Sequence, residues 1–223
     1  AYIDAQLADT ILIVGANPYE TQTNYFLNHM IPNLNGDTLD LKQSTFPGEP
    51  AAPGRMIIMD PRRTISVATA EAAAGKGNVL HLQIEPGTDI AVMNAIARTV
   101  LERRWHDVAF IRERAEWQTF EAYQRSSLGS DRDAATVVTE AAALADILEA
   151  DIHKAAEWIA KPKSGGVRRR TLFHYEKGLI WGVKNYENIA SIVDLGLLTG
   201  SVGKPGTGIS RLGGHQEAYV RPP

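Results

Sequence analysis

The sequence predicts an α/β protein whose core is a parallel, Rossmann-like sheet with helices on both faces. Three observations support this fold class. Residues 11–14 form an unbroken apolar run, Ile-Leu-Ile-Val, which suits a strand covered on both faces and stops at Gly15. Residues 56–59 repeat this pattern and stop at Asp60. Apolar residues at helical spacing follow the strands, most clearly over residues 90–104.

The composition is that of an ordinary globular protein. The chain has 223 residues, 44% of them apolar and 22% charged, and its net charge of −3 gives no electrostatic reason to expect nucleic acid or an anionic membrane as a partner. It shows neither an apolar run of about 18 to 20 residues nor a signal-peptide pattern. Without cysteine, these residues hold no disulfide, thiolate nucleophile or cysteine-ligated cluster. The first residue is alanine rather than methionine, so we expect a piece of a longer protein.

Three regions are expected along the chain. Residues 1–104 should form the α/β region, residues 105–163 a mainly helical segment, and residues 164–223 a strand, a helix and a glycine-rich loop at the C-terminal end. Residues 161–170 are interpreted as a flexible, solvent-exposed basic connector. The histidines that lack partners at metal-ligand spacing, and that we expect to bind no metal, are His29, His106 and His153.

The turn after the first strand suits an anionic ligand. A glycine at position 15 lets a ligand approach the main chain, and Asn17 and Pro18 turn the chain toward a helix expected from Tyr19 to Met30. The free N–H groups in the first turn of that helix favour a phosphate or another anion. An ordinary strand-to-helix turn explains this stretch equally well.

The segments on either side of the second strand are less regular. Pro32 is expected to end the preceding helix, and residues 33–55, which are rich in proline and glycine, to form a surface excursion that covers a site. After the second strand, Ile65, Val67 and Thr69 alternate with small or polar residues, which predicts a short strand.

The second strand ends in Asp60-Pro61-Arg62-Arg63. An acidic residue at the carboxyl end of a strand beside a nucleotide turn can accept hydrogen bonds from ribose hydroxyls or from a guanine edge. The alternative is a turn or N-cap aspartate next to two solvated arginines.

The third strand end repeats this theme. Residues 79–84 alternate apolar and polar side chains, which predicts a strand in which His81 packs rather than binds a ligand. Gly87 and Asp89 follow, and Thr88 is a candidate N-cap for the amphipathic helix. Three successive strand ends therefore carry residues that suit a nucleotide.

The C-terminal region combines regular elements with many glycines. A strand is expected over residues 171–175 and a helix over residues 185–198. Residues 196–214 contain seven glycines in nineteen positions, too many for a packed element, so main chain can lie directly on a ligand. Arg211 and His215 bring a fork of N–H donors and an imidazole near one point. Alternatively, Arg211 pairs with a carboxylate and His215 caps a turn.

Several motifs occur in a characteristic order. They are G-x-N-P-x-E-T after the first strand, D-P-R-R-T after the second, P-G-T-D at a helix start and L-x-T-G-x-V-G-x-P-G-T-G near the end. In this order they resemble the molybdopterin guanine dinucleotide oxidoreductases of the dimethyl sulfoxide reductase family. Within that family, Y-E-K-G-L-I-W-G-V-K-N-Y-E-N and R-L-G-G-H-Q-E-x-Y-V-R-P-P resemble the large subunits of arsenite oxidases, with Ala218 where glycine is expected.

The resemblance implies a much larger subunit with its own cofactors and partners. These are a molybdenum held by two molybdopterin guanine dinucleotides, a [3Fe-4S] cluster whose ligands lie outside this chain, a Rieske-type small subunit, and a downstream electron acceptor such as a cytochrome or cupredoxin. The implied location is the bacterial periplasm. The implied reaction is the two-electron oxidation of arsenite to arsenate by oxygen-atom transfer at the molybdenum centre.

The resemblance also assigns site residues. Arg211 and His215 would line the arsenite funnel, together with a histidine and a glutamate from an earlier part of the subunit. The residues that would hold a guanine dinucleotide are Gly15, Asn17, Glu20, Thr21, Asp60, Arg62, Gly87 and Asp89, with Lys177 and the loop glycines Gly203, Gly206 and Gly208 nearby. No metal ligand is expected within this chain.

Other functions are compatible with parts of the sequence. One is a molybdopterin oxidoreductase that acts on another oxyanion or on formate. A second is a nucleotide-binding module without activity of its own, and the isolated piece is not expected to turn over alone. A nicotinamide-dependent dehydrogenase is disfavoured because no G-x-G-x-x-G follows the first strand.

Overall fold

The computed structural model describes residues 2–213, and within them the chain forms a five-stranded, wholly parallel sheet in the order β3-β2-β1-β4-β5. The predicted α/β, Rossmann-like fold class is confirmed. The strands are β1 (Thr10–Val14), β2 (Arg55–Met59), β3 (Val79–Leu82), β4 (Thr171–Tyr175) and β5 (Gly208–Arg211).

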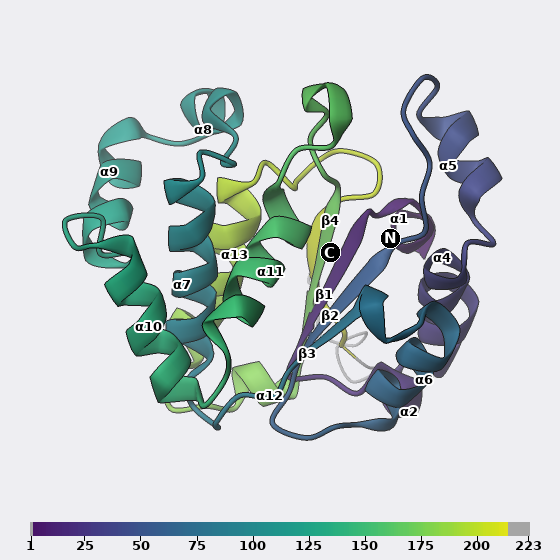
Figure 1. Ribbon diagram of the computed structural model, residues 1–223, viewed down its shortest axis with the longest axis horizontal. Helices are drawn as coiled ribbons and strands as arrows, with labels where there is room; N and C mark the ends of the chain where they lie inside the picture. The colour runs from purple at the N-terminus through teal and green to yellow at the C-terminus, as the bar shows by residue number, and fades with distance from the viewer. Residues whose placement is uncertain (1, 214–223) are drawn as a thin grey trace, which may run out of the picture.

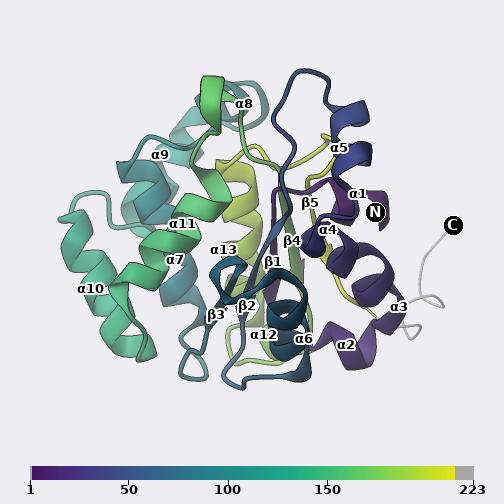
Figure 2. The ribbon, with the colours of Figure 1, turned by 45° about the vertical axis from the view of Figure 1, so that its right-hand side comes forward.

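Helices cover both faces of the sheet, which Figure 1 shows nearly edge-on and Figure 2 from a second direction. One layer contains α1 (Tyr2–Leu7), α2 (Pro18–Thr21), α3 (Thr23–Tyr25), the π-helical turn η1 (Phe26–Met30), α4 (Ile31–Asn35), α5 (Leu39–Thr45) and α6 (Ile65–Ala74). The other contains α7 (Asp89–Glu102), α8 (Val108–Arg114), α9 (Trp117–Ser126), α10 (Ala134–Ala145), α11 (Glu149–Ala160) and α13 (Asn185–Leu198). The short elements are α12 (Lys177–Ile180), η2 (Lys76–Asn78) and η3 (Ser164–Gly166). Across residues 2–213, none of the helices combines the length and apolarity that crossing a bilayer requires.

Alternate residues of each central strand serve the two layers. Leu12 and Val14 of β1 pack into the cluster that includes α7 and α13, whereas Ile11 and Ile13 pack into the cluster that includes η1 and α6. All four side chains are fully buried. The unbroken apolar run recognised in the sequence is therefore the pattern that a doubly covered parallel strand requires.

The register brings the strand ends into line. Val14 pairs with Met59 on one side and with Tyr175 on the other, and Tyr175 pairs with Arg211. We call the side on which the chain leaves the strands the carboxyl edge and the opposite side the amino edge. The strand order reverses between β1 and β4, and open α/β sheets bind ligands outside the carboxyl ends at such a switch point.

The short strand predicted at Ile65, Val67 and Thr69 is wrong. These residues lie in α6, where Val67 and Ala70 are fully buried and Ile65 is exposed. The alanine-rich sequence that follows strongly favours helix, and this preference outweighs three alternating residues. A spacing of three between the buried residues is the helical period.

Two boundaries in the first layer also differ from the prediction. The helix expected from Tyr19 to Met30 is divided into α2, α3 and η1. Pro32 does not end it, because it lies in the first turn of α4, where the N–H that proline lacks is not needed. Residues 33–55 are not wholly irregular, since they include α5 and the fully buried Asn33.

Residues 161–170 are not a free, solvated connector as predicted. The Lys163 Nζ lies 3.1 Å from the Asp9 Oδ2, and the Arg170 guanidinium donates two hydrogen bonds of 2.7 Å to the Glu49 carboxylate. These four residues form what we call the amino-edge charge cluster. It joins the segment before β4 to the segment before β2, so these two segments are held together by ion pairs between charged side chains.

The amino-edge charge cluster predicts a pH-dependent local stability. Its hydrogen bonds, chiefly from Arg170, lower the pKa of Glu49 from 4.5 to about 2. A carboxyl group with a depressed pKa stabilises the closed state above its unfolded pKa and loses that effect as the pH falls. In the full-length subunit, Glu49→Gln should cost residues 46–55 on the order of 1 to 2 kcal/mol of local opening free energy, measured by hydrogen exchange.

The cost of Glu49→Gln should be constant from about pH 8 to about pH 5 and shrink below pH 4.5. The matched control is Glu140→Gln, which breaks the exposed Arg132–Glu140 pair and should leave local opening unchanged. A cost that is independent of pH down to pH 4 would mean that the Glu49 charge does not close this segment.

The glycine-rich stretch is only partly a loop. Residues 208–211 form β5, which pairs with β4 at the edge of the sheet. Gly196 lies within α13, and a Cβ there would come 2.5 Å from the Ile209 Cδ1. This glycine therefore brings α13 close to β5, and its purpose is packing rather than a ligand.

Candidate functional site

Two adjoining hollows lie at the carboxyl edge, close to the switch point. The first has a volume of about 310 Å³ and the second about 610 Å³. They share Pro86, Gly87, Asp89 and Gly178, so we treat them together as the carboxyl-edge hollow. Six of the residues assigned from the sequence line the first part, namely Gly15, Asn17, Asp60, Arg62, Gly87 and Asp89.

The floor of the hollow is a contact between two glycines. Gly15 directly follows β1 and has a φ of +59°. Gly178 is the second residue of α12, which comes shortly after β4. The Gly178 N–H donates to the Gly15 carbonyl at 3.0 Å. A Cβ on Gly178 would lie 2.7 Å from the Gly15 Cα, and a Cβ on Gly15 would lie 2.5 Å from the Leu179 nitrogen. Only glycine permits this approach, which keeps the main chain open to a ligand.

Asn17 is held in place by its neighbours. The Ser66 hydroxyl donates to the Asn17 Oδ1 at 2.6 Å, and the Asn17 Nδ2 donates to the Glu20 Oε2 at 2.6 Å. The Thr21 hydroxyl donates to the Asn17 carbonyl at 3.2 Å. Glu20 and Thr21 therefore support Asn17 and do not line the hollow themselves.

Ser66 is a functional candidate that the sequence reasoning missed. It is fully buried in the first turn of α6, and its oxygen also accepts from the Tyr19 N–H at 3.0 Å. It thus links α6 to the turn after β1. The signal was hidden because the segment had been interpreted as a strand, in which Ser66 would be an ordinary polar residue.

Asp60 combines the two roles that the sequence left open. Its Oδ1 accepts from the Arg62 N–H at 2.8 Å, which is an aspartate turn, and the residue also lines the hollow. His81 packs in β3 as predicted, with its Nε2 2.9 Å from the Asp60 carbonyl. The end of β2 is thereby fixed from two sides, and Asp60 as a residue is only 7% exposed.

Asp89 begins α7 beside the hollow. Burial raises its pKa, with a smaller contribution of the same sign from the Asp60 carboxylate and an opposing backbone hydrogen bond. Thr88 occupies the N-cap position, but its hydroxyl donates to the Glu85 carbonyl at 2.7 Å instead of capping the helix. An acceptor pair at positions 60 and 89 suits a ligand edge that carries N–H groups.

Lys177 lines the second part of the hollow. Its Nζ lies 4.9 Å from the centre of the Trp181 ring, and Trp181 is 75% exposed. Val183 and Tyr186 are exposed as well. This rim places a cation and aromatic surface beside the glycine floor.

Arg211 lies at the carboxyl end of β5, on the same edge as the hollow. Its Nε and Nη2 approach the Glu176 Oε1 at 3.0 and 2.9 Å. The chain beyond Arg211 is anchored by the Gln22 amide, which donates to the Leu212 carbonyl at 3.1 Å and to the Gly213 carbonyl at 3.3 Å. The carboxylate partner considered as an alternative in the sequence is thus present. His215 lies outside the described residues.

The structure does not bring the loop glycines Gly203, Gly206 and Gly208 to the hollow. The Gly206 N–H donates to the Asp4 Oδ1 at 2.8 Å, and a Cβ at Gly206 would lie 3.1 Å from the carbonyl of Leu7, just before β1. These glycines lie at the amino edge because they precede β5, which runs parallel to its neighbour. The sequence interpretation missed β5 and therefore placed the loop on the wrong side.

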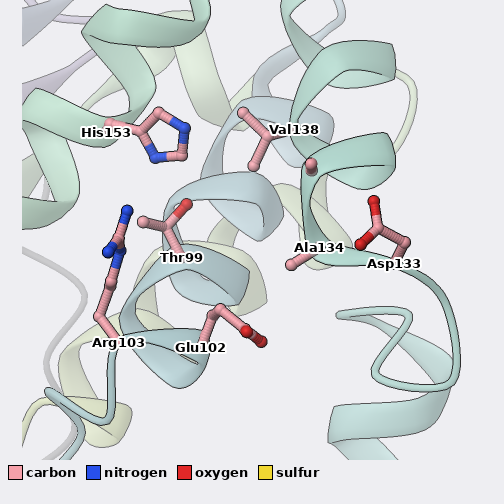
Figure 3. A pocket seen from close by; sticks show the side chains of 8 residues that line it. Thr99, Glu102, Arg103, Asp133, Ala134, Val138 and His153 are labelled. Atoms are coloured by element: carbon pink, nitrogen blue, oxygen red, sulfur yellow. The ribbon is translucent and has the colours of Figure 1, made fainter.

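A third hollow, of about 400 Å³, lies among α7, α10 and α11, away from the carboxyl edge. Figure 3 shows Arg103 and His153 on one side of it and Glu102 and Asp133 on the other. No set of three potential ligands is positioned to hold a metal anywhere in residues 2–213.

The fold and the hollow define an α/β protein with a parallel, doubly covered sheet and a hollow at its switch point. A family model for molybdopterin oxidoreductases matches residues 2–220, and the chain belongs to this family. Membership implies a molybdenum–molybdopterin cofactor. The carboxyl-edge hollow fits such a group, because the close contact between Gly15 and Gly178 leaves main chain exposed at its floor and its walls carry charged donors and acceptors.

Three relatives illustrate the breadth of the family. The chain is 48% identical over all of its 223 residues to arsenite oxidase subunit AioA from Herminiimonas arsenicoxydans, of which it covers 26%. It is 34% identical to iodate reductase subunit IdrA from Denitromonas iodatirespirans, over 93% of this chain and 23% of that protein. It is 26% identical to formate dehydrogenase H from Escherichia coli (strain K12), over 92% and 23%. The chain spans about a quarter of the length of these relatives.

Proposed function

We propose that this chain is the part of an arsenite-oxidising large subunit that holds one molybdopterin guanine dinucleotide and supplies Arg211 to the substrate site. One observation carries the proposal: Arg211 stands at the same edge of the sheet as the dinucleotide-compatible hollow. The 48% identity to an arsenite oxidase subunit supports arsenite over other substrates.

The hollow would hold the dinucleotide through main chain and a few side chains. The glycine floor leaves room for phosphate oxygens, and the N-terminus of α7 lies beside it. Asp60 and Asp89 would accept hydrogen bonds from the guanine or ribose. The residues proposed to contact it are Gly15, Asn17, Asp60, Arg62, Gly87, Asp89 and Lys177, with Glu20 and Thr21 supporting Asn17.

The bound molybdenum group would supply the two-electron oxygen-atom transfer that turns arsenite into arsenate. The protein's own contribution is to orient the substrate. Arsenous acid is neutral near pH 7 and carries hydroxyl groups, to which the Arg211 N–H groups can donate and with which His215 can exchange hydrogen bonds. The same donors would stabilise negative charge as the anionic product forms.

The partners of the full-length subunit follow from the same proposal. Electrons would leave through a [3Fe-4S] cluster elsewhere in the subunit to a Rieske-type small subunit, and then to a cytochrome or cupredoxin in the periplasm. The name of the most similar protein described above, a subunit of an oxidase, is consistent with a multi-subunit enzyme.

A second candidate is reduction of an oxyanion. It is favoured by the iodate reductase relatives, which are 34% and 33% identical over nearly the whole chain. The hollow itself does not discriminate, since the dinucleotide would be the same. The discrimination must come from the residues around the substrate, among which Arg211 is the one within the described part of this chain.

A substrate panel tests the proposed function. The full-length subunit, produced with its small subunit, should contain molybdenum and oxidise arsenite with an artificial acceptor. Its kcat/KM for arsenite should exceed that for formate oxidation, or for iodate and nitrate reduction with a reduced dye, by at least about 100-fold, the discrimination that a few well-placed hydrogen bonds provide. Preferred turnover of iodate would select the second candidate, and a product without molybdenum would leave only a binding module.

A further inference from the structure

Glu176 occupies a fixed position at the switch point between β1 and β4. Its N–H donates to the Val14 carbonyl at 3.1 Å, and its own carbonyl accepts from the Leu179 N–H at 2.9 Å as α12 begins. The residue is 8% exposed. The main chain of Glu176 is therefore fixed by hydrogen bonds to β1 and α12, so its carboxylate cannot turn out into solvent.

One of the two oxygens of the Glu176 carboxylate accepts hydrogen bonds from the described residues, and the other does not. Its Oε1 is the acceptor for Arg211, whereas its Oε2 is buried and has no hydrogen-bond partner among the described residues. A buried carboxylate oxygen without a donor is costly, and native proteins normally satisfy it. The position thus calls for a further donor from outside the described chain.

The pair has two consequences for a ligand near Arg211. The first is orientation, because an acceptor shared by Nε and Nη2 fixes the plane of the guanidinium. The second is charge, because the arginine and the glutamate cancel. A pair with no net charge gives a neutral hydroxylated molecule such as arsenous acid an advantage over an anion, which gains no long-range attraction from this pair.

We propose that Glu176 is a positioning and specificity-determining residue: it orients Arg211 and neutralises it, so that the site takes a neutral oxyacid and releases its anionic product. The identity of the substrate in this inference rests on the proposed function. The predicted effect of the Glu176 charge on anion binding does not. A lone arginine would hold arsenate, an anion, more tightly than the pair does.

The test uses the full-length subunit with its small subunit and the variants Glu176→Gln and Glu176→Asp. Glu176→Gln keeps the shape and removes the charge, whereas Glu176→Asp keeps the charge at a shorter reach. Glu140→Gln makes the same chemical change in the exposed Arg132–Glu140 pair and serves as the matched control. The readouts are molybdenum content, kcat and KM for arsenite, and the dissociation constant of arsenate measured by calorimetry on the oxidised enzyme.

For Glu176→Gln we expect the KM for arsenite to rise about tenfold and the dissociation constant of arsenate to fall by about fivefold to tenfold, which is the scale of one charge-assisted contact. Molybdenum content should stay at the wild-type level. In Glu176→Asp the dissociation constant of arsenate should be as high as in the wild type, whereas the KM for arsenite should lie between the values of the wild type and Glu176→Gln. Glu140→Gln should match the wild type in both constants. Opposite shifts of the two constants are not produced by general damage to the fold.

The outcomes separate this inference from the proposed function. If the wild type does not oxidise arsenite but Glu176→Gln still binds arsenate more tightly, the substrate is wrong and the role of Glu176 stands. If Glu176→Gln leaves both constants unchanged, or weakens both together, Glu176 does not set the charge of the site and the inference is overturned.

Discussion

Replacing Arg211 by alanine in the full-length enzyme should lower kcat/KM for arsenite by roughly 30-fold to 1000-fold. The loss corresponds to on the order of 2 to 4 kcal/mol of transition-state stabilisation, the usual cost of removing a donor aimed at developing negative charge. Steady-state kinetics on the molybdenum-loaded enzyme measure it. Arg211→Lys keeps the charge but not the planar fork, so its loss should be intermediate.

Two controls make the Arg211 result interpretable. Removing Arg211 alone leaves the Glu176 carboxylate buried without its partner, which itself destabilises the site. The double variant Arg211→Ala with Glu176→Gln removes that penalty and should regain thermal stability but not activity. Arg132→Ala, in an exposed ion pair, should be silent. Wild-type arsenite turnover in Arg211→Ala would exclude Arg211 from the substrate site.

Gly178→Ala should prevent normal loading of the cofactor. The new Cβ would meet the Gly15 Cα at 2.7 Å, and because an alanine Cβ has no rotamers and the Gly15 Cα is main chain, no side-chain rotation can relieve the clash. Overpacking of this kind costs about 1 to 3 kcal/mol, and here it would also displace Gly15, which lines the hollow. The melting temperature and the molybdenum content per subunit should therefore both fall.

Gly77→Ala is the matched control for Gly178→Ala. A Cβ at position 77 meets nothing within 4 Å, and its φ is not in the left-handed region. This variant should keep its molybdenum and change stability by less than about 0.5 kcal/mol. A Gly178→Ala enzyme that loads and melts like the wild type would show that the glycine contact is not part of the cofactor site.

The main architecture could be predicted from the sequence because its strands and helices show unbroken apolar runs or regular apolar spacing. The apolar runs before Gly15 and Asp60 are typical of strands buried on both faces, and in a parallel sheet the ends of such strands meet at one edge. The helix over residues 185–198 was also recognised with its bounds, since its apolar spacing is regular. From these alone, the carboxyl edge and most of the hollow follow.

The errors have physical causes in particular residues. The alternation at Ile65, Val67 and Thr69 was too short to outweigh the helix preference of the alanines around them. The edge strand β5 carries Gly208 and is half-buried throughout, so it has neither an apolar run nor a clean alternation. Missing it put Gly203 and Gly206 at the hollow, whereas they lie at the opposite edge.

Hydrogen-bonded pairs of polar residues that lie far apart in the chain could not be predicted from the sequence. Ser66 reaches Asn17 across 49 positions, and Glu176 reaches Arg211 across 35. Nothing local marks either partner, because each pair exists only once the strands are aligned. The site's organisation, as opposed to its member residues, therefore had to come from the structure.

The central claim is that the carboxyl edge at the switch point between β1 and β4 is the dinucleotide site and that Arg211 faces the substrate from the same side. A cryo-electron microscopy map of the loaded, full-length enzyme tests it directly. The account predicts dinucleotide density across the Gly15–Gly178 floor, with the base near Asp60 or Asp89 and the Arg211 guanidinium toward the metal. Dinucleotide density at the amino edge, beside Gly203 and Gly206, would contradict it.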